Sequence, residues 1–377
     1  MSERITRREL LERCAAMCGG LAIGRGPGSV AGVAAGMTAG KPISRRTDGG
    51  TKCLEGARIR WIVGWTPGGG FDTYSRLAEP FIERALGAQI AIDNVPGAGG
   101  LVGALTLSRA RPDGRTLGIL NGSGFLWNRN PDSSTTPDLS REFTVLARVS
   151  RRQQVIMANP ATGVRSIADL IALSRRRAIV AGITGPDSSN FATLAAVTDL
   201  LGVSTEYVAG YPGSREVILG LLRGDCDITS VDIETFGQVP DLARMNPVLQ
   251  ITPERSADPR IPDVPHLAGP TGLISVQPEL FAGDAARARS LAAAIAAYLE
   301  FGRLFAGPGG MEPMLRDCLE QAMYTALTDP GFAEAARRAG RSIDIVAGAD
   351  VRRGIRAVTD AVRPIVPVAA AAARRIR

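Results

Sequence analysis

The sequence contains almost no histidine. His266 is the only one among 377 residues, and it lies in the proline-rich stretch PDVPHLAGP. The five cysteines, at positions 14, 18, 53, 226 and 318, include no CxxC pair. A zinc site needs cysteines or histidines at close spacing, and Ser-His-Asp or Cys-His catalysis would have to run through His266. We therefore expect no metal site, and we interpret His266 as an ordinary loop residue.

Lysine and long apolar runs are scarce as well. Lys41 and Lys52 are the only lysines, so 42 of the 44 basic residues are arginines, and the formal net charge is +7. A basic chain favours acidic partners. The arginines, however, are scattered among acidic residues, and 175–177 is the one tight cluster, so we expect no nucleic-acid partner. No apolar run reaches the ~20 residues of a membrane span.

The first 40 residues resemble an export signal rather than part of the fold. A charged start, MSERITRRELLER, is followed by a short apolar stretch, CAAMCGGLAIG, and by a small-residue segment. That order is typical of a cleaved signal, and Arg7 and Arg8 followed by two leucines resemble a twin-arginine signal. Glu9, Glu12 and Arg25 depart from that pattern, and a disordered tail is the alternative.

Cleavage of such a signal would change the cysteine count. A cut near residues 35–39 would remove Cys14 and Cys18. The three remaining cysteines, Cys53, Cys226 and Cys318, permit at most one disulfide. The sequence does not indicate which pair would form it.

The body of the chain alternates strands, glycine-rich turns and helices. The first block predicts strands at 59–65, 89–93 and 117–122, and helices at 74–85 and 101–110. The pattern restarts at residue 154, with strands predicted at 155–160, 178–183, 205–210 and 225–232, and helices at 166–176, 191–202 and 215–224. After a proline-rich stretch, alanine-rich helices are predicted at 284–305, 314–327 and 332–339. This alternation predicts parallel α/β structure in two domains.

The glycine-rich turns indicate where a ligand binds. PGGG at 67–70 and PGAGG at 96–100 each lie between a predicted strand and a predicted helix, and TGPDSS and GYPGS do so in the second block. Helix amino termini offer unpaired N–H groups to anions, and glycines let a ligand approach them. No lysine follows in the P-loop pattern, and Val102 occupies the last glycine position of a dinucleotide fingerprint. We therefore expect no cofactor, and a cleft between two lobes that suits a small carboxylate.

Several of these motifs together resemble a known family. PGGGFD, DNVPGAGG, RPDGRTLGIL, GYPGSREVILGLLRGDCD and RIPDVP are similar, in order and spacing, to the substrate-binding proteins of tripartite tricarboxylate transporters, also called Bug receptors. The likeness spans about residues 57–360. It implies a type II periplasmic-binding-protein fold with a discontinuous first lobe. We expect an export leader at 1–40, lobe 1 at 57–153, lobe 2 at 154–252, and the second part of lobe 1 at 253–377.

The resemblance also implies a function. Members bind small carboxylates and deliver them to a membrane transporter or act as sensors, so we expect a periplasmic, monomeric binding protein without catalytic activity. Two departures bear on which acid fits. Many members have Thr where this chain has Phe71, and many have His in the loop that here reads Ser188, Ser189 and Asn190.

The predicted ligand-binding residues come from both lobes. We expect a carboxylate to reach the amides of Gly69, Gly70 and Phe71, with Asp72 capping the helix or contacting the ligand. Trp65 and Phe71 either wall the pocket or belong to the core, and Asp232 accepts a hydrogen bond from a ligand or caps a helix. The full predicted set is Trp65, Gly69, Gly70, Phe71, Asp72, Asn94, Gly99, Ser123, Ser188, Ser189, Tyr211 and Asp232.

Two other classes of function compete with a binding protein. An α/β enzyme acting on a small carboxylate would need a nucleophile or base, but the sequence contains no GxSxG motif and His266 has no evident partner. A module that binds only protein partners would leave the glycine-rich turns without a role. The sequence therefore favours ligand binding, and it does not identify the acid.

Overall fold

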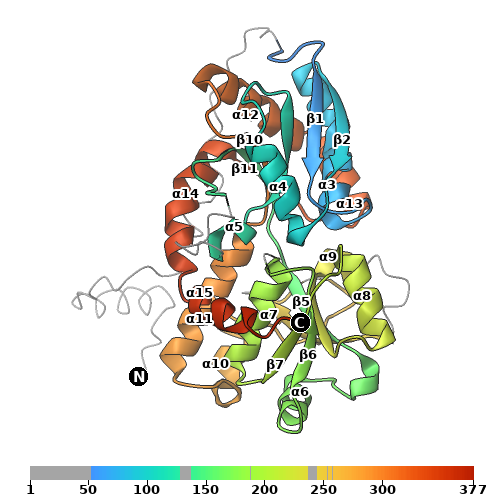
Figure 1. Cartoon of the computed structure of the whole chain (residues 1–377), viewed down its shortest axis with the longest axis vertical. Coiled ribbons are helices and arrows are strands. Elements are labelled where there is room, and N and C mark those ends of the chain that lie inside the picture. The colour runs from blue at the N-terminus through green and yellow to red at the C-terminus, as the bar shows by residue number, and fades with distance from the viewer. Residues whose placement is uncertain (1–51, 128–136, 187, 237–243, 253, 257) are drawn as a thin grey trace, which may run out of the picture.

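The chain is described by a computed structural model that covers residues 52–127, 137–186, 188–236, 244–252, 254–256 and 258–377. The predicted leader at 1–40 lies outside these residues. Two separate β-sheets organise the chain into two lobes along its long axis (Figure 1). Within the described ranges no helix is long and apolar enough to cross a membrane.

The first lobe contains a six-stranded sheet of order β11-β4-β10-β3-β1-β2. Strands β1, β2 and β3 are parallel, as the sequence predicted, but β10 runs antiparallel between β3 and β4. The strands are β1 (Arg58–Val63), β2 (Gln89–Asn94), β3 (Thr116–Asn121), β4 (Phe143–Ser150), β10 (Arg303–Pro308) and β11 (Val346–Ala347).

The second lobe contains a five-stranded sheet of order β7-β6-β8-β5-β9. Here β6 is parallel to β7 and β8, whereas β5 is antiparallel to β8 and β9. The strands are β5 (Gln154–Ala158), β6 (Ile179–Gly182), β7 (Thr205–Val208), β8 (Ile228–Asp232) and β9 (Asn246–Ile251). The two-lobed α/β architecture is thus confirmed, with antiparallel strands where the chain passes between lobes.

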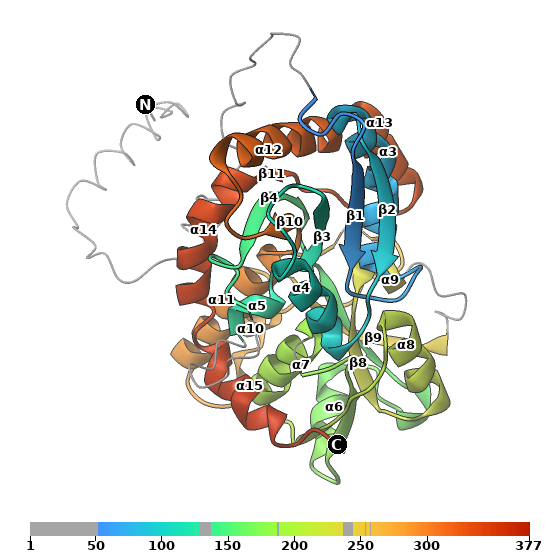
Figure 2. The same ribbon diagram turned by 45° about the horizontal axis from the view of Figure 1, so that its top comes forward.

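The helices follow the glycine-rich turns and cover both sheets (Figures 1 and 2). Helix α3 begins at Gly70, the last residue of the PGGG turn, and continues through Pro80 to Leu86. The α-helices are α3 (Gly70–Leu86), α4 (Leu101–Ser108), α5 (Gly124–Trp127), α6 (Ile167–Ser174), α7 (Ser189–Leu200), α8 (Ser214–Arg223), α9 (Ile233–Phe236), α10 (Leu273–Val276), α11 (Ala285–Glu300), α12 (Pro313–Leu327), α13 (Pro330–Arg338), α14 (Gly348–Ala361) and α15 (Ile365–Ala373). Short 3₁₀ turns occupy Ala98–Gly100, Pro160–Thr162 and Pro278–Leu280.

One predicted helix is too long. The alanine-rich helix predicted at 284–305 ends at Glu300, and the chain enters β10 at Arg303. Gly302 lies between them with φ +60, and a Cβ at this position would be 2.0 Å from the Ser150 carbonyl oxygen. Only glycine fits this left-handed, crowded turn. The turn redirects the chain so that Leu304 to Ala306, which are fully buried, enter the middle of the sheet.

Helices α11, α14 and α15 run along one side of both lobes (Figures 1 and 2). Helix α11 packs on α7 and on α14, and α15 packs mainly on α7. Beyond α15, Ile376 forms a parallel bridge with Tyr207 on β7, the edge strand of the second sheet. The carboxyl-terminal part of the chain therefore contacts both lobes, and one continuous apolar core joins them on this side.

Cys53 and Cys318 form a disulfide, with their Cα atoms 6.1 Å apart. The bond ties the segment before β1 to helix α12 across 265 residues of chain. Cys226 is a free, buried thiol, and burial raises its pKa to about 12. Of the three cysteines that would remain after signal cleavage, Cys53 and Cys318 are therefore the pair.

Candidate ligand-binding cleft

The PGGG turn is held in place by side chains of the first lobe. Gly68 has φ +80, a conformation that favours glycine, and Gly69 is the N-cap of α3 with extended backbone. The Asp72 carboxylate accepts from the Gly68 N–H at 2.8 Å, from Arg76 Nε at 2.9 Å and from Asn94 Nδ2 at 3.0 Å. The turn is therefore rigid, and the first N–H groups of α3 remain available to a ligand.

The amino termini of three helices line one cleft between the lobes. Gly69, Gly70 and Phe71 come from the start of α3, Ser188 and Ser189 from the start of α7, and Gly213 and Ser214 from the start of α8. Each helix has at least ten residues and carries partial positive charge at this end. The remaining walls are formed by Trp65, Thr66, Gly99, Asn121, Arg152, Thr184, Asn190, Ser230, Val231 and Asp232.

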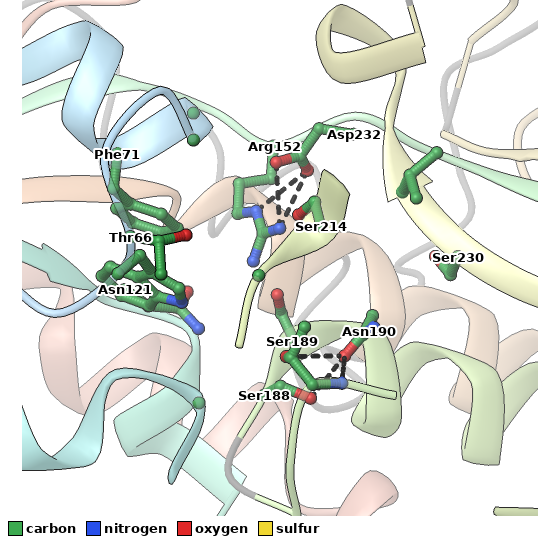
Figure 3. A pocket seen from close by; sticks show the side chains of 17 residues that line it. Thr66, Phe71, Asn121, Arg152, Ser188, Ser189, Asn190, Ser214, Ser230 and Asp232 are labelled. Carbon is green, nitrogen blue, oxygen red and sulfur yellow. Dashed lines mark hydrogen bonds and ion pairs between the residues drawn. The ribbon is translucent and has the colours of Figure 1, made fainter. Parts of the chain in front are cut away.

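Arg152 supplies the cleft's cation. It lies in the crossing between β4 and β5, and it holds Asp232 in two hydrogen bonds, Nε to Oδ1 and Nη2 to Oδ2, each 3.0 Å (Figure 3). Arg152 is 8% exposed, and its Nη1 makes no hydrogen bond to any described residue. The guanidinium is thus oriented by Asp232 and keeps one N–H edge for a ligand anion.

Asp232 is shared with a second arginine from the other lobe. Arg303 Nη2 donates to Asp232 Oδ2 at 2.7 Å, and both side chains are buried. Burial raises the pKa of Asp232, but the guanidinium groups of Arg152 and Arg303 outweigh it and hold the pKa below its usual range. Asp232 is therefore an ionised carboxylate whose oxygens are occupied by arginines.

A second carboxylate, the partly buried Glu234, lies next to this pair. Glu234 lies 3.6 Å from Arg303 and 3.7 Å from Arg341, and the Tyr74 hydroxyl donates to it at 2.8 Å. Burial of the Tyr74 hydroxyl raises its pKa, so the phenol is neutral. Arg152, Arg303 and Arg341 therefore form a charged cluster with Asp232 and Glu234 beside the cleft.

Two aromatic residues form a wall next to this charge. The Trp65 and Phe71 rings stack with centroids 3.6 Å apart and planes 10° apart. On Phe71, the guanidinium carbons of Arg303 and Arg152 lie 5.4 and 5.7 Å from the ring centroid. Phe71 therefore both lines the cleft and belongs to the buried core of the first lobe.

The two lobes touch at the edges of the cleft. A Cβ on Gly213 would lie 3.1 Å from Thr66 Oγ1, and a Cβ on Gly185 would lie 3.2 Å from the Gly99 nitrogen. These approaches bring loops of the second lobe against both glycine-rich loops of the first. The two lobes are therefore in contact beside the cleft.

The structure places eight of the twelve predicted residues along the cleft: Trp65, Gly69, Gly70, Phe71, Gly99, Ser188, Ser189 and Asp232. The other four lie behind it. Asp72 and Asn94 fix the PGGG turn, with Asn94 also donating to the Trp65 carbonyl at 2.8 Å. Ser123 is fully buried and donates to the Tyr298 carbonyl, and Tyr211 packs against Gly220 of α8.

Sequence reasoning missed the arginines. Arg152 follows Arg151 in the crossing, and nothing local distinguishes it from the other 41 arginines. Arg303 and Arg341 come from the distant carboxyl-terminal part, so only the tertiary fold brings them to Asp232 and Glu234. Asn121 had a local signal, because it ends the third strand at the same sheet edge as the glycine-rich turns.

The chain's single histidine does not line the cleft. His266 is buried away from it, with Nε2 3.3 Å from Thr271 Oγ1, and burial lowers its pKa. Among the described residues no group of three or more His, Cys, Asp and Glu could hold a metal ion. The cleft's described lining is polar and rich in main-chain donors, and Arg152 adds a guanidinium, which suits binding of an anion.

Two α/β lobes with a cleft between them that is lined by helix amino termini are typical of solute-binding proteins. Residues 75–281, more than half of the chain, match the family model described as tripartite tricarboxylate transporter family receptor. The chain therefore belongs to this receptor family, as its motifs indicated.

Curated relatives agree with this assignment. A UPF0065 protein from the tcbD-tcbE intergenic region of Pseudomonas sp. strain P51 is 24% identical over 253 residues, covering 65% of this chain and 71% of the relative. Protein BugT of Bordetella pertussis is 25% identical over 218 residues, covering 56% and 66%. The chain thus matches about two thirds of each relative's length.

Solved structures share the fold. Rpa4515 of R. palustris, solved with adipate, superimposes with a TM-score of 0.67 at 19% identity, covering 83% of this chain and 97% of that one. MatC of Rhodopseudomonas palustris, with bound malate, gives a TM-score of 0.63 at 19% identity and covers 83% of this chain and 99% of that one. The periplasmic binding protein BugD gives a TM-score of 0.63 at 17% identity and covers 85% of this chain and 99% of that one. The periplasmic-binding-protein fold is thereby confirmed.

Proposed function

We propose that this protein captures a small carboxylate in the cleft between its lobes. The observation that carries the proposal is the open Nη1 edge of Arg152, a buried guanidinium aimed into a cleft that also receives three helix amino termini. Hydrogen bonds to charged groups contribute about 1.5–3 kcal/mol each. Adipate and malate, found in two structural neighbours, are acids of the size this cleft suits.

The captured acid is delivered to a tripartite tricarboxylate-type transporter or to a sensor in the membrane. Family membership supports this role, because the family is described as a transporter receptor. We further propose that the protein acts as a monomer, with its two lobes presented to one membrane partner. We assign residues 57–153 and 253–377 to lobe 1, and 154–252 to lobe 2.

The protein works outside the cytoplasm. The disulfide between Cys53 and Cys318 supports this location, because such bonds persist in oxidising compartments. The twin-arginine-like sequence at Arg7 and Arg8 provides a route that exports folded proteins. An N-terminal leader on a receptor of this family is consistent with periplasmic action.

Binding, and not conversion, is the proposed activity. An enzyme would need a general base or nucleophile in contact with the acid, whereas Asp232 is already occupied by two arginines. Ser189 has no histidine near it in the cleft lining to activate its hydroxyl. The alternative, an α/β enzyme that acts on a small carboxylate, is tested by following the acid during incubation with the protein.

The experiment that tests the proposal is a thermal-shift screen of carboxylic acids against the mature protein, followed by calorimetry on each acid that raises the melting temperature. A ligand at 100 times its Kd stabilises the folded state by about 2.7 kcal/mol, which is a measurable shift. Chromatography of the recovered acid then distinguishes binding from turnover. If no mono-, di- or tricarboxylate stabilises the protein, the proposed function is wrong.

A further inference from the structure

A second, smaller hollow adjoins the cleft in the first lobe. It contains about 340 Å³ of space between atoms, against about 550 Å³ in the cleft, both including space open to solvent. The two share three lining residues, Trp65, Gly99 and Asn121. A ligand held in the cleft therefore has the hollow directly beside it.

The walls of this hollow are apolar. Leu101 and Ala104 come from α4, Ile119 and Leu120 from β3, and Phe125 from α5. The indole of Trp65 packs on Gly100, where a Cβ would lie 2.4 Å from the ring. Apart from Trp65, Asn121 has the only polar side chain among the described residues that line the hollow. Burial of a hydrocarbon group against such a surface is favourable, whereas burial of a charge is not.

Asn121 stands at the boundary between the two spaces. It is 5% exposed, and its Oδ1 is buried without a hydrogen-bond partner among the described residues. A buried acceptor left unpaired is costly. A ligand that extends from the cleft toward the hollow passes this amide and can meet it with a hydroxyl, an amine or a water molecule. In Figure 3 the Asn121 side chain lies beside Thr66 and Phe71, on the first-lobe side of the cleft.

The charges around the two spaces match a single carboxylate. Arg152 is the only cationic side chain among their described lining residues, and it is already paired with Asp232. A second carboxylate in the hollow would be buried among Leu101, Ala104 and Phe125, with no cation among the described residues that line it, which is strongly unfavourable.

We propose that the solute is a monocarboxylic acid with an apolar body, whose carboxylate lies against Arg152 and the helix amino termini and whose body fills the hollow beyond Trp65 and Asn121. This rests on the proposed function and narrows it to one ligand class. Citrate-like acids, with several charges and no apolar body, are poor ligands for this chain.

The first test is a ligand series measured by calorimetry on the full mature chain. The probes are acetate, butyrate, hexanoate, octanoate and phenylacetate, compared with succinate, adipate and citrate. Each methylene buried in the hollow should raise the affinity about fourfold, until the body is longer than the hollow. Adipate should bind at least tenfold more weakly than hexanoate, because its second carboxylate is left without a cation.

The second test changes the hollow without touching the cleft. Ala104→Leu fills the hollow from α4, and it should reduce the affinity for hexanoate at least tenfold while leaving acetate binding unchanged. Leu101→Ala enlarges it and should shift the preferred acid to a longer chain. Val102→Leu is the matched control, because Val102 lies on the same helix and is 42% exposed. It should change neither the affinity for hexanoate nor the preferred chain length. Circular dichroism verifies the fold of each variant.

The outcomes separate the two proposals. If monocarboxylates bind more tightly with chain length and Ala104→Leu removes that gain, the apolar subsite is established. If succinate or citrate binds more tightly than every monocarboxylate, and Ala104→Leu and Leu101→Ala have no effect on the series, the subsite is wrong while carboxylate binding stands. If no acid in either group binds, the proposed function itself fails.

Discussion

Arg303 and Asp232 form an ion pair between the two lobes. Arg303 lies on β10 of the six-stranded sheet, Asp232 ends β8 of the five-stranded sheet, and Nη2 is 2.7 Å from Oδ2. The two side chains are 1% and 5% exposed. Arg152, which lines the cleft, binds the same carboxylate. Asp232 therefore contacts both Arg303 at the lobe interface and Arg152 at the cleft.

The first prediction concerns this shared carboxylate. Asp232→Asn leaves Arg152 and Arg303 without their common counter-charge, and breaking a buried pair in this way costs about 3–5 kcal/mol. Urea unfolding at pH 7 should show that loss. The control is Asp263→Asn, an exposed acid in the loop before α10, which should change stability by less than about 0.5 kcal/mol. Equal stability of the two variants would contradict the assigned role of Asp232.

The second prediction is a pH dependence. Burial raises the pKa of Asp232, but the neighbouring arginines lower it by more, so that the pKa lies below its usual value. The pKa of Asp72 is also lowered, because hydrogen bonds from Arg76, the Gly68 N–H and Asn94 outweigh the effect of burial. A carboxyl whose folded pKa lies below its unfolded value, about 3.9, stabilises the protein above that value. This stabilisation is lost as the pH falls through the folded pKa.

The measurement is the free energy of unfolding between pH 7 and pH 2. It should remain nearly constant above about pH 5 and fall below about pH 4, when these carboxylates take up protons in the unfolded state. The Asp232→Asn variant should lose stability less steeply over the acid range than the wild type. A variant with an unchanged acid slope would show that Asp232 does not contribute to it.

The third prediction concerns closure. Ligand binding should close the lobes by a hinge at the crossings, near residues 150–156 and 248–253, as rigid lobes commonly do. Gly185 approaches Gly99 across the cleft, and its φ is not in the left-handed region. Gly185→Val should therefore keep its fold but separate the lobes.

Small-angle scattering and calorimetry together test this. The wild type should become more compact with a saturating acid, and Gly185→Val should show a smaller change with at least tenfold weaker binding. Ser204→Val, at an exposed position before β7 of the second lobe, adds a similar side chain away from the cleft and should close normally. A radius of gyration that does not change in the wild type would count against hinge closure.

The fourth prediction concerns the compartment. Replacing both Arg7 and Arg8 by lysine should leave the chain unprocessed in the cytoplasm, because a twin-arginine signal depends on that pair. Fractionation of cells that express each form measures this, with a thiol label reporting whether Cys53 and Cys318 are oxidised. If wild type and variant are both cytoplasmic and unprocessed, the export proposal is wrong.

Local patterns in the sequence predicted the parts of the fold that local interactions determine. The parallel strands β1, β2 and β3 and the helix after PGGG follow from apolar periodicity and glycine placement. Strand β10 was predicted as the end of a helix, because the alanine-rich pattern continues to Phe305 and only the contact of Gly302 with Ser150 ends it. Strand β4, which lies beside β10, was not predicted.

The candidate cleft was partly predictable for the same reason. Its glycine-rich turns and serine caps are consecutive residues with a recognisable role at helix amino termini. Arg152, Arg303 and Arg341 were not identifiable among 42 arginines, because their function depends on contacts with Asp232 and Glu234 across long stretches of chain. Ser123 illustrates the opposite error, since its position after β3 suggested the cleft whereas its hydroxyl is bonded to the Tyr298 carbonyl.

The central claim is that a carboxylate binds at the helix amino termini beside Arg152, and one pair of variants tests it most directly. Ser189 is 3% exposed, begins α7 and lines the cleft. Ser189→Asp places a negative charge there, and an acid at the start of a helix is favourable for folding. Ser189→Asn has nearly the same size and no charge.

The measurement is calorimetry with the acid that binds most tightly in the screen. Ser189→Asp should bind this acid on the order of 100-fold or more weakly than Ser189→Asn, because two like charges about 4 Å apart repel strongly in a protein site. Equal affinities for two folded variants would contradict the account, since the carboxylate would then not lie in this cleft.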